Sequence, residues 1–260
     1  MITAERVTHE ITPGRPVLRS VSFTVAEGEH VVLLGANGSG KTTLLRVLAG
    51  LVFPRGGHAV YDGVVLTRRT LRRDGFERRL RREVGISFQV PDAMLFNPTV
   101  FDEIAFGPRQ LEQPPRDLEE RVGRWAEIAG VGHLLDRSPF SLSAGEKQRV
   151  CLAALLVLEP RVLLLDEPTA SLDPRSTGWL VDLLQDVPVT TVVSTHNLSL
   201  APELGDRVLV LSEQHELIHD GPLEPFLADR ERLIAANLVH THRHRHGERE
   251  HRHWHIHDWS

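Results

Sequence analysis

The chain has 260 residues, of which 41% are hydrophobic and 25% charged, so it can bury the core of one large α/β domain and is not disordered in bulk. Its net charge of −5 excludes a nucleic-acid binder that works by bulk positive charge. A single cysteine, Cys151, excludes an intrachain disulfide, and no signal peptide and no apolar stretch of roughly 18 residues is present. These features predict a soluble cytoplasmic protein.

Short apolar runs alternate with segments of helical period along the chain. Two strand-like stretches flank a turn at 13–16 and predict a small antiparallel β part at the N-terminus. Buried strands are expected at 31–34, 162–165, 191–193 and 208–211, and helices at 44–51 and 179–184. Residues from about 90 to 150, with a break at Pro114-Pro115, predict a helical insertion. The alternation predicts an α/β fold in which helices cover both faces of a parallel sheet.

A glycine-rich segment directly follows the apolar run at 31–34. Residues 35–43 match the pattern GxxxxGK[ST], with a predicted strand before them and a predicted helix after them. The glycines let backbone N–H groups line a concavity for phosphate oxygens, and the helix start adds partial positive charge. Lys41 is expected to reach the β- and γ-phosphates, and the Thr42 hydroxyl to ligate Mg²⁺. The expected nucleotide contacts are Gly35, Ala36, Asn37, Gly38, Ser39, Gly40, Lys41, Thr42 and Thr43.

Two carboxylates end the predicted strand at 162–165. Asp166 is suited to holding Mg²⁺, and Glu167 to polarising the water that attacks the γ-phosphate. In the alternative, both residues merely end a strand at the surface. The presence of the 35–43 segment favours the catalytic interpretation.

Further motifs follow one another in a fixed order. Gln89 comes after a predicted strand, the segment 142–149 reads Leu-Ser-Ala-Gly-Glu-Lys-Gln-Arg, and 166–168, 171–173 and His196 follow. This order resembles the nucleotide-binding subunits of ABC transporters over about residues 5–239. The resemblance implies an ATP hydrolase with a P-loop NTPase fold, one ATPase domain at 1–239 and an ABC-type helical insertion at about 90–150.

The resemblance also implies roles for particular residues. Two subunits would meet head-to-tail and sandwich two ATP molecules, with Ser143 and Gly145 of one chain at the phosphates held by the other. Asp173 would couple the two sites, while His196 would contact the γ-phosphate. The implied catalytic residues are Lys41, Gln89, Glu167 and His196, and the implied Mg²⁺ ligands are Thr42, Gln89 and Asp166.

Two positions depart from the family pattern. Ala144 stands where the family usually has Gly, and we expect the methyl group to be tolerated or to slow closure. Ile11, or in the alternative His9, stands where an aromatic ring usually stacks on adenine. An aliphatic contact at this position predicts weaker or less selective base binding.

A narrower resemblance lies in residues 84–92, 95–100 and 102–108, which look like the ATPases of energy-coupling-factor importers for cobalt, nickel or vitamins. It implies a second ATPase subunit, identical or not, a transmembrane coupling subunit and a substrate-binding membrane subunit, with the chain at the cytoplasmic face of the membrane. Met94 replaces the Gln usual in this block. Four apolar residues in it are candidates for core or docking positions: Leu95, Phe96, Val100 and Phe106.

The last 21 residues hold eight of the fifteen histidines. We expect residues 240–260 to form a flexible tail that binds Ni²⁺ or Co²⁺ loosely through neutral imidazoles, because imidazole is a good ligand for both ions. The expected ligands are His242, His244, His246, His251, His253 and His255. In the alternatives, the tail is solvated and without a role, or a purification tag. Combined with the importer resemblance, it favours nickel or cobalt as the cargo, without choosing between them.

Two rival functions come from other classes. One is a soluble ABC-type ATPase that acts on nucleic acid or ribosomes, and the other is a metal-buffering protein in which ATP hydrolysis is secondary. About a hundred residues separate Lys41 from Ser143 without sustained heptads, which disfavours the first rival. The complete set Asp166, Glu167 and His196 disfavours the second.

Overall fold

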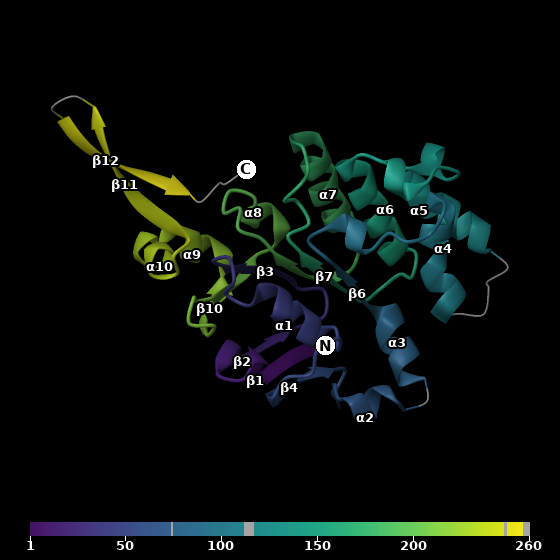
Figure 1. Ribbon diagram of the computed structural model, residues 1–260, viewed down its shortest axis with the longest axis horizontal. Coiled ribbons are helices and arrows are strands. Elements are labelled where there is room, and N and C mark those ends of the chain that lie inside the picture. The colour runs from purple at the N-terminus through teal and green to yellow at the C-terminus, as the bar shows by residue number, and fades with distance from the viewer. Residues whose placement is uncertain (74, 112–116, 247–248, 257–260) are drawn as a thin grey trace. The chain divides into compact units, whose positions relative to one another are not determined.

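The computed structural model describes residues 1–73, 75–111, 117–246 and 249–256, the last segment from 240 onward as backbone only (Figure 1). The chain divides into two compact units. Unit 1 is made of Met1–Leu66 and Val192–Ser260, and unit 2 of Thr67–Thr191. None of the described helices combines the length and the apolar character needed to cross a membrane.

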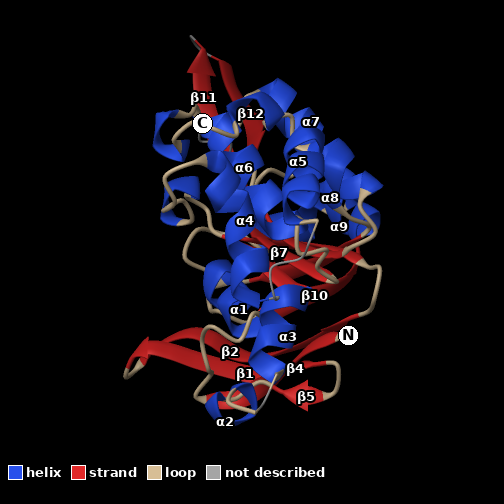
Figure 2. Ribbon diagram, turned by 90° about the vertical axis from the view of Figure 1, so that its right-hand side faces the viewer, coloured by secondary structure: helices blue, strands red, loops and turns tan. Residues whose placement is uncertain are grey.

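The N-terminal part of unit 1 is an antiparallel sheet in the order β2-β1-β4-β5 (Figure 2). Its strands are β1 (Ile2–Thr12), β2 (Arg15–Val25), β4 (Gly56–Tyr61) and β5 (Val64–Val65). Ile2 lies opposite both Val25 and Tyr61, and all three side chains are fully buried. The alternation of buried and exposed residues gives this sheet one apolar face. The small antiparallel β part predicted from the sequence is confirmed.

Unit 1 also contains strands in the order β10-β9-β3-β8. β3 (His30–Gly35) runs parallel to β9 (Arg207–Leu211), and β10 (Leu217–Pro222) is antiparallel to β9. β8 (Thr190–Ser194) begins in unit 2 and ends in unit 1. β3 is apolar on both faces because it is covered on both, and its residues 31–34 are fully buried. The helices of unit 1 are α1 (Lys41–Leu48), α8 (Ala201–Leu204), α9 (Leu223–Ala228) and α10 (Arg230–Ala235).

The C-terminal segment contains the histidines of the tail predicted from the sequence, and the flexibility of this tail stays a prediction. Its backbone forms an antiparallel hairpin of β11 (Val239–His246) and β12 (Arg249–Ile256), drawn in yellow in Figure 1. The strict two-residue repeat of this segment suits a strand, because a strand also repeats every two residues. His257 lies outside the described residues.

Unit 2 combines strands in the order β8-β7-β6 with helices. β6 (Val84–Ser87) and β7 (Val162–Asp166) are parallel, with Val84 opposite Val162 and Ser87 opposite Leu165. The helices are α2 (Arg68–Leu71), α3 (Phe76–Glu83), α4 (Val100–Leu111), α5 (Leu118–Ile128), α6 (Ala144–Leu156) and α7 (Pro174–Asp186). Short 3₁₀ turns are η1 (Pro91–Ala93), η2 (Gly132–Leu134) and η3 (Pro139–Ser141). Pro114 and Pro115 lie outside the described residues.

Candidate functional site

The loop between β3 and α1 is shaped by glycines in conformations that other residues rarely adopt. Gly40 has φ +111°, and a Cβ built on it would lie 2.2 Å from the carbonyl oxygen of Val17 in β2. Gly35, with φ +154°, would bring a Cβ within 2.6 Å of the Leu211 carbonyl oxygen. Gly38 has φ +82° and open space around it. The backbone is therefore closely packed at Gly35 and Gly40 and open at Gly38, and these positions require the conformational freedom of glycine.

The polar groups of this loop suit a phosphate. Gly40 is the N-cap of α1 and offers no side chain to the first turn, which carries no acidic residue. The start of a helix carries partial positive charge, which attracts an anion. Ser39 Oγ is buried without a hydrogen-bond partner, while Lys41 Nζ donates to the Gly35 carbonyl at 2.7 Å. These features suit the phosphate contacts predicted for residues 35–43, and the Lys41 side chain is turned towards the loop.

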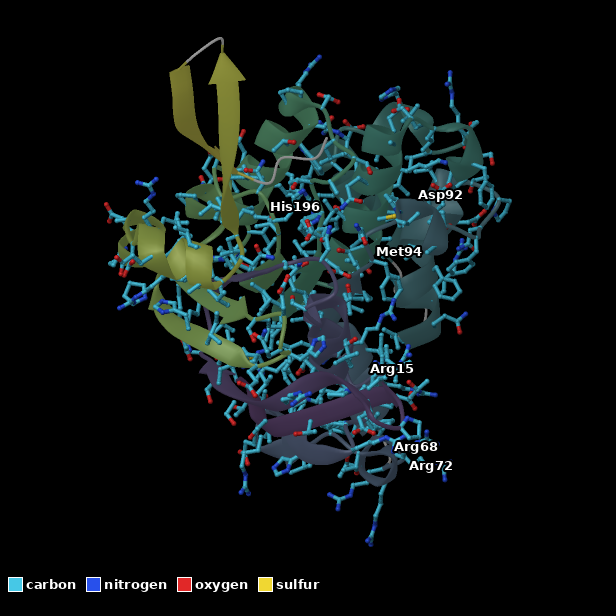
Figure 3. All side chains as sticks on the ribbon, turned by 60° about the vertical axis from the view of Figure 1, so that its left-hand side comes forward. Arg15, Arg68, Arg72, Asp92, Met94 and His196 are labelled. Carbon is cyan, nitrogen blue, oxygen red and sulfur yellow. The ribbon has the colours of Figure 1, made fainter. Side chains whose placement is uncertain are left out.

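His196 directly follows the strand that lies beside β3. The backbone N–H of Thr195 donates to the Leu33 carbonyl at 3.2 Å, which fixes the end of β8 next to β3. Thr195 Oγ1 accepts a hydrogen bond from the Asn197 N–H at 3.0 Å and so shapes the turn around His196. His196, labelled in Figure 3, is half-buried. The glycine-rich loop at 35–43, here called the P-loop, follows β3, and His196 follows β8. Both therefore lie at the ends of adjacent strands of one sheet.

The P-loop has a contact that the sequence did not indicate. His215 Nδ1 donates to the Ser39 carbonyl at 3.2 Å, and the His215 carbonyl accepts from the Arg19 N–H at 2.8 Å. His215 has a left-handed backbone with φ 68° in the turn between β9 and β10. Since 176 positions separate His215 from Ser39, no local motif connects them. His215 therefore fixes the backbone of the P-loop at Ser39.

Replacing His215 by Gly is expected to weaken ATP binding about fivefold, because one hydrogen bond contributes about 1 kcal/mol. Glycine accepts the left-handed backbone, so the substitution removes the side chain without adding strain. Calorimetric titration with a non-hydrolysable ATP analogue measures the effect. Asp62→Gly is the matched control, because Asp62 is also left-handed, with φ 47°. Equal affinity of the His215 variant and the wild type would contradict the role of His215.

In unit 2, β7 ends in the two predicted carboxylates. Asp166 is the last residue of the strand and is 3% exposed, and Glu167 follows it at 6% exposed. Glu167 has φ 49°, which is unusual for a residue with a Cβ. Strained backbone of this kind concentrates at functional sites. Carboxylate oxygens are the ligands that Mg²⁺ prefers in proteins, so two carboxylates at the end of β7 fit a site for Mg²⁺ and water.

The segment 142–149 forms the start of α6. Ser143 is its N-cap and forms a capping box with Glu146: the Glu146 N–H donates to Ser143 Oγ at 3.4 Å, and the Ser143 N–H donates to Glu146 Oε2 at 2.8 Å. Hydrogen bonds from Ser143 lower the pKa of the Glu146 carboxyl. Ala144 is the first helical residue and has no positive φ, so its methyl group causes no backbone strain. The effect of Ala144 on closure stays a prediction.

Gly145 lies against the start of α7. Asp173 caps this helix by accepting the N–H of Arg175 at 2.9 Å and of Ser176 at 3.0 Å, together with the Ser176 hydroxyl at 2.9 Å. The hydrogen bonds from Ser176 lower the pKa of Asp173. A Cβ on Gly145 would lie 3.0 Å from Ser176 Oγ. The two predicted residues Gly145 and Asp173 are thus brought together through Ser176.

A stacked pair links α6 to α7 and was not indicated by the sequence. The guanidinium carbon of Arg149 lies 3.9 Å from the centroid of the Trp179 ring, within the range of a cation–π interaction. Arg149 also donates to the Ala129 carbonyl at 3.0 Å, just beyond the end of α5. Because α6 begins with the phosphate-binding candidates Ser143 and Gly145, this pair fixes their direction relative to α7.

Gln89 follows β6 and is exposed. The adjacent Phe88 N–H donates to the sulfur of Met94 at 3.5 Å, so Met94 supplies a local contact in place of the usual Gln. The loop beyond Met94 is held by Glu103, which is 4% exposed and accepts the N–H groups of Phe96 at 2.9 Å and Asn97 at 2.8 Å. The segment from Gln89 to α4 is therefore held in place by hydrogen bonds within unit 2. Asp92 and Met94 of this segment are labelled in Figure 3.

A strand, a glycine-rich loop that ends in the GK[ST] pattern and a helix define a P-loop nucleotide-binding protein. Residues 18–170 match the family model described as ABC transporter, and the chain belongs to this family. It is 43% identical over 232 residues to the nickel import ATP-binding protein NikO of Rhodobacter capsulatus, which covers 87% of this chain and 91% of that protein. Relatives from Methanosarcina acetivorans and Caldanaerobacter subterraneus, also 43% identical, carry only general ABC transporter names.

Solved structures agree with this assignment. CbiO1 from Clostridium perfringens, part of the ABC transporter complex CbiONQ, has a TM-score of 0.75 at 31% identity and covers 91% of this chain and 94% of its own. The ATP-binding cassette MJ0796, solved as a dimer after hydrolysis with ADP and Pi, has a TM-score of 0.75 at 26% identity and covers 86% of this chain and 99% of its own. The chain is the ATP-binding and ATP-hydrolysing subunit of a transporter, and its P-loop NTPase fold is confirmed.

Proposed function

We propose that the chain powers an energy-coupling-factor type importer for nickel or cobalt from the cytoplasmic face of the membrane. The observation that carries this proposal is an exposed aromatic pair: the rings of Phe96 and Phe106 meet edge to face with centroids 4.7 Å apart, and Phe96 is 58% exposed. Leu95 and Val100, which belong to the same segment (residues 95–108), are buried in the core, whereas Phe96 and Phe106 are exposed at the surface. The similarity to NikO and CbiO1 supports the cargo class.

Exposed aromatic rings beside the Gln89 loop suit docking of a helix from the transmembrane coupling subunit. Large apolar groups on a surface mark interaction sites, and aromatic residues are frequent anchors of such interfaces. Val90, 56% exposed, adds to the apolar area on the same segment. A substrate-binding membrane subunit completes the proposed assembly, and nucleic acid has no part in it.

The proposed mechanism of hydrolysis assigns to each residue the role that the family resemblance implies. The P-loop amides and Lys41 hold the β- and γ-phosphates, while Glu167 orients and deprotonates the attacking water. His196 contacts the γ-phosphate. Thr42, Asp166 and Gln89 would hold Mg²⁺, which neutralises developing charge on the phosphates.

Two chains pair head-to-tail in this proposal, and each ATP lies between one P-loop and the partner's α6. The N-terminus of α6 offers Ser143 and Gly145 to the γ-phosphate, because a helix start attracts anions. Gly145 lies close to Ser176, whose hydroxyl donates to Asp173. A shift of Gly145 on phosphate binding would therefore be transmitted through Ser176 to Asp173. Loss of the γ-phosphate then weakens the closed pair, and the two chains separate. This opening and closing drives the membrane subunits.

Uptake of radioactive nickel and cobalt tests the cargo. Cells that lack the chain are expected to lose uptake, wild-type protein to restore it, and Glu167→Gln protein to fail. Unchanged uptake of both metals without the chain would refute the proposal. Sedimentation of the protein with ribosomes, together with no recovery of membrane subunits, would favour the soluble ABC-type ATPase instead.

The docking surface makes a separate prediction. Phe96→Ser is expected to reduce recovery of the transmembrane subunit from detergent-solubilised membranes about thirtyfold, because an aromatic anchor contributes about 2 kcal/mol or more. ATP turnover of the isolated protein stays unchanged. Ile128→Ser, at a 44% exposed residue of α5, is the matched control and keeps full recovery. Full recovery with the Phe96 variant would place the docking surface elsewhere.

A further inference from the structure

The hairpin β11–β12 has a register that pairs histidine with histidine. The backbone partners are His240 with His255, His242 with His253, and His244 with His251. The intervening pairs are Thr241 with Trp254, Arg243 with Arg252, and Arg245 with Glu250. Because successive residues of a strand belong to opposite faces, all six paired histidines lie on one face of the hairpin. His246 lies opposite Arg249 and is outside this ladder.

The spacing of the ladder suits a metal ion. Opposite residues of an antiparallel pair have Cα atoms about 4.5–5.5 Å apart, and residues two apart on one strand are separated by about 6.5–7 Å. Two neighbouring rungs therefore bring four imidazole-bearing positions into one small quadrilateral. Imidazole nitrogen binds Ni²⁺, Co²⁺ and Zn²⁺, which take four or more ligands. The central quadrilateral is His242, His244, His251 and His253.

The remaining composition of the hairpin makes its pairing weak in the absence of such a ligand. An isolated two-stranded hairpin is at best marginally stable in water. The rung of Arg243 opposite Arg252 places like charges across the strands, which is destabilising. A metal ion that joins the histidine rungs would offset both effects, because ligation of residues from two strands couples binding to folding.

The base of the hairpin is fixed to unit 1. Leu238 is 6% exposed, and its N–H donates to the Leu233 carbonyl of α10 at 2.9 Å. Asn237 donates through Nδ2 to Glu213 Oε1 at 2.7 Å, in the turn that also contains His215. β11 therefore begins from a fixed point. Among the side chains that the structure describes, all before residue 240, no group of three or more His, Cys, Asp or Glu could hold a metal.

We propose that the hairpin is a transition-metal site for a divalent nitrogen-seeking ion such as Ni²⁺ or Co²⁺, formed by the cross-strand rungs His242–His253 and His244–His251. This differs from a flexible polyhistidine segment, in which any two histidines are equivalent. The site is distinct from the nucleotide site and does not depend on ATP hydrolysis or on the importer assignment.

Two double variants of the full-length protein with equal histidine counts separate these cases. His242→Ala/His253→Ala removes one central rung, whereas His240→Ala/His246→Ala removes two histidines and leaves the central quadrilateral intact. Calorimetric titration with NiCl₂ and CoCl₂ is expected to show at least about tenfold weaker binding for the central variant, and a change of less than about threefold for the outer variant. Both variants retain the wild-type ATP turnover.

Two spectroscopic measurements complete the test. Co²⁺ bound to the wild-type protein is expected to show a visible absorption spectrum of nitrogen coordination that the central variant loses. Hydrogen exchange at the backbone amides of 239–256 is expected to slow when Ni²⁺ is added to the wild type and to the outer variant only. Equal affinities of the two double variants, or no metal binding by the wild type, would overturn the proposal.

Discussion

Replacing Glu167 by Gln is expected to lower ATP turnover about 10²- to 10⁴-fold, the usual contribution of a general base. The amide has the shape of the carboxylate but cannot accept a proton from the attacking water. Glu167 is buried and has a left-handed backbone directly after β7, so a substitution of equal size leaves the local structure unchanged. ATP affinity is expected to stay within about twofold, because the γ-phosphate loses no cationic contact. Steady-state phosphate release and calorimetry measure the two quantities.

Glu159→Gln is the matched control for this variant. Glu159 also belongs to unit 2 and has a left-handed backbone, with φ 51°, but its carboxylate is exposed and forms an ion pair with Arg124 at 2.6 Å. An exposed ion pair contributes little, so turnover of the control should match the wild type. If Glu167→Gln and Glu159→Gln proteins hydrolysed ATP equally fast, Glu167 would not be the base.

Replacing Lys41 by Gln is expected to weaken ATP binding about 10- to 150-fold. Lys41 Nζ is 2.7 Å from the Gly35 carbonyl oxygen and 3.4 Å from the Ala36 carbonyl oxygen, so it lies within the glycine-rich loop. Hydrogen bonds from a charged donor contribute about 1.5–3 kcal/mol, which corresponds to this range of affinity. Glutamine keeps a polar head of similar length but removes the charge. Titration with a non-hydrolysable analogue measures the loss.

The chain has only one other lysine, which supplies the control for Lys41. Lys147 forms an ion pair with Asp92 at 2.6 Å and ties α6 to η1. Lys147→Gln removes the same charge from the protein as Lys41→Gln does, so it controls for net charge. Its ATP affinity should equal that of the wild type. Comparable losses in both variants would mean that overall charge, and not a contact at the P-loop, determines nucleotide affinity.

The sequence predicted the parts of the fold that local patterns encode. β3 and β7 are apolar on both faces, and their predicted cores at 31–34 and 162–165 are fully buried. The residues of the P-loop, the carboxylates after β7 and the N-terminus of α6 could be predicted because each depends on a few consecutive residues. The helix caps Ser143 and Asp173 belong to this local class as well.

Contacts between distant segments could not be predicted in the same way. His215 reaches Ser39 across 176 positions, and Arg149 stacks on Trp179 although nothing in either motif indicates it. The exposure of Phe96 beside the buried Leu95 depends on how Glu103 holds the loop, which hydrophobic patterning does not reveal. Ile11 is 70% exposed near the end of β1, so its expected contact with adenine stays a prediction.

The histidine segment shows a further limit of sequence patterns. A spacing of two indicates which residues share a face of an extended chain, but it does not say which strand pairs with which. The register of β11 with β12 adds this information, since it places His240 inside the ladder and His246 outside it. The set of proposed ligands therefore narrows from six histidines to a central group of four.

ATP-dependent pairing of two chains tests the central claim most directly. The Glu167→Gln protein is suited to this test, because it should hold ATP without hydrolysing it. Sedimentation velocity with Mg²⁺ and ATP is expected to show a dimer, and the same protein with ADP a monomer. Adding Ser143→Arg, which places a bulky cation at the N-terminus of α6, should keep the protein monomeric with ATP. A monomer with Mg²⁺ and ATP at every protein concentration would contradict the proposed nucleotide sandwich.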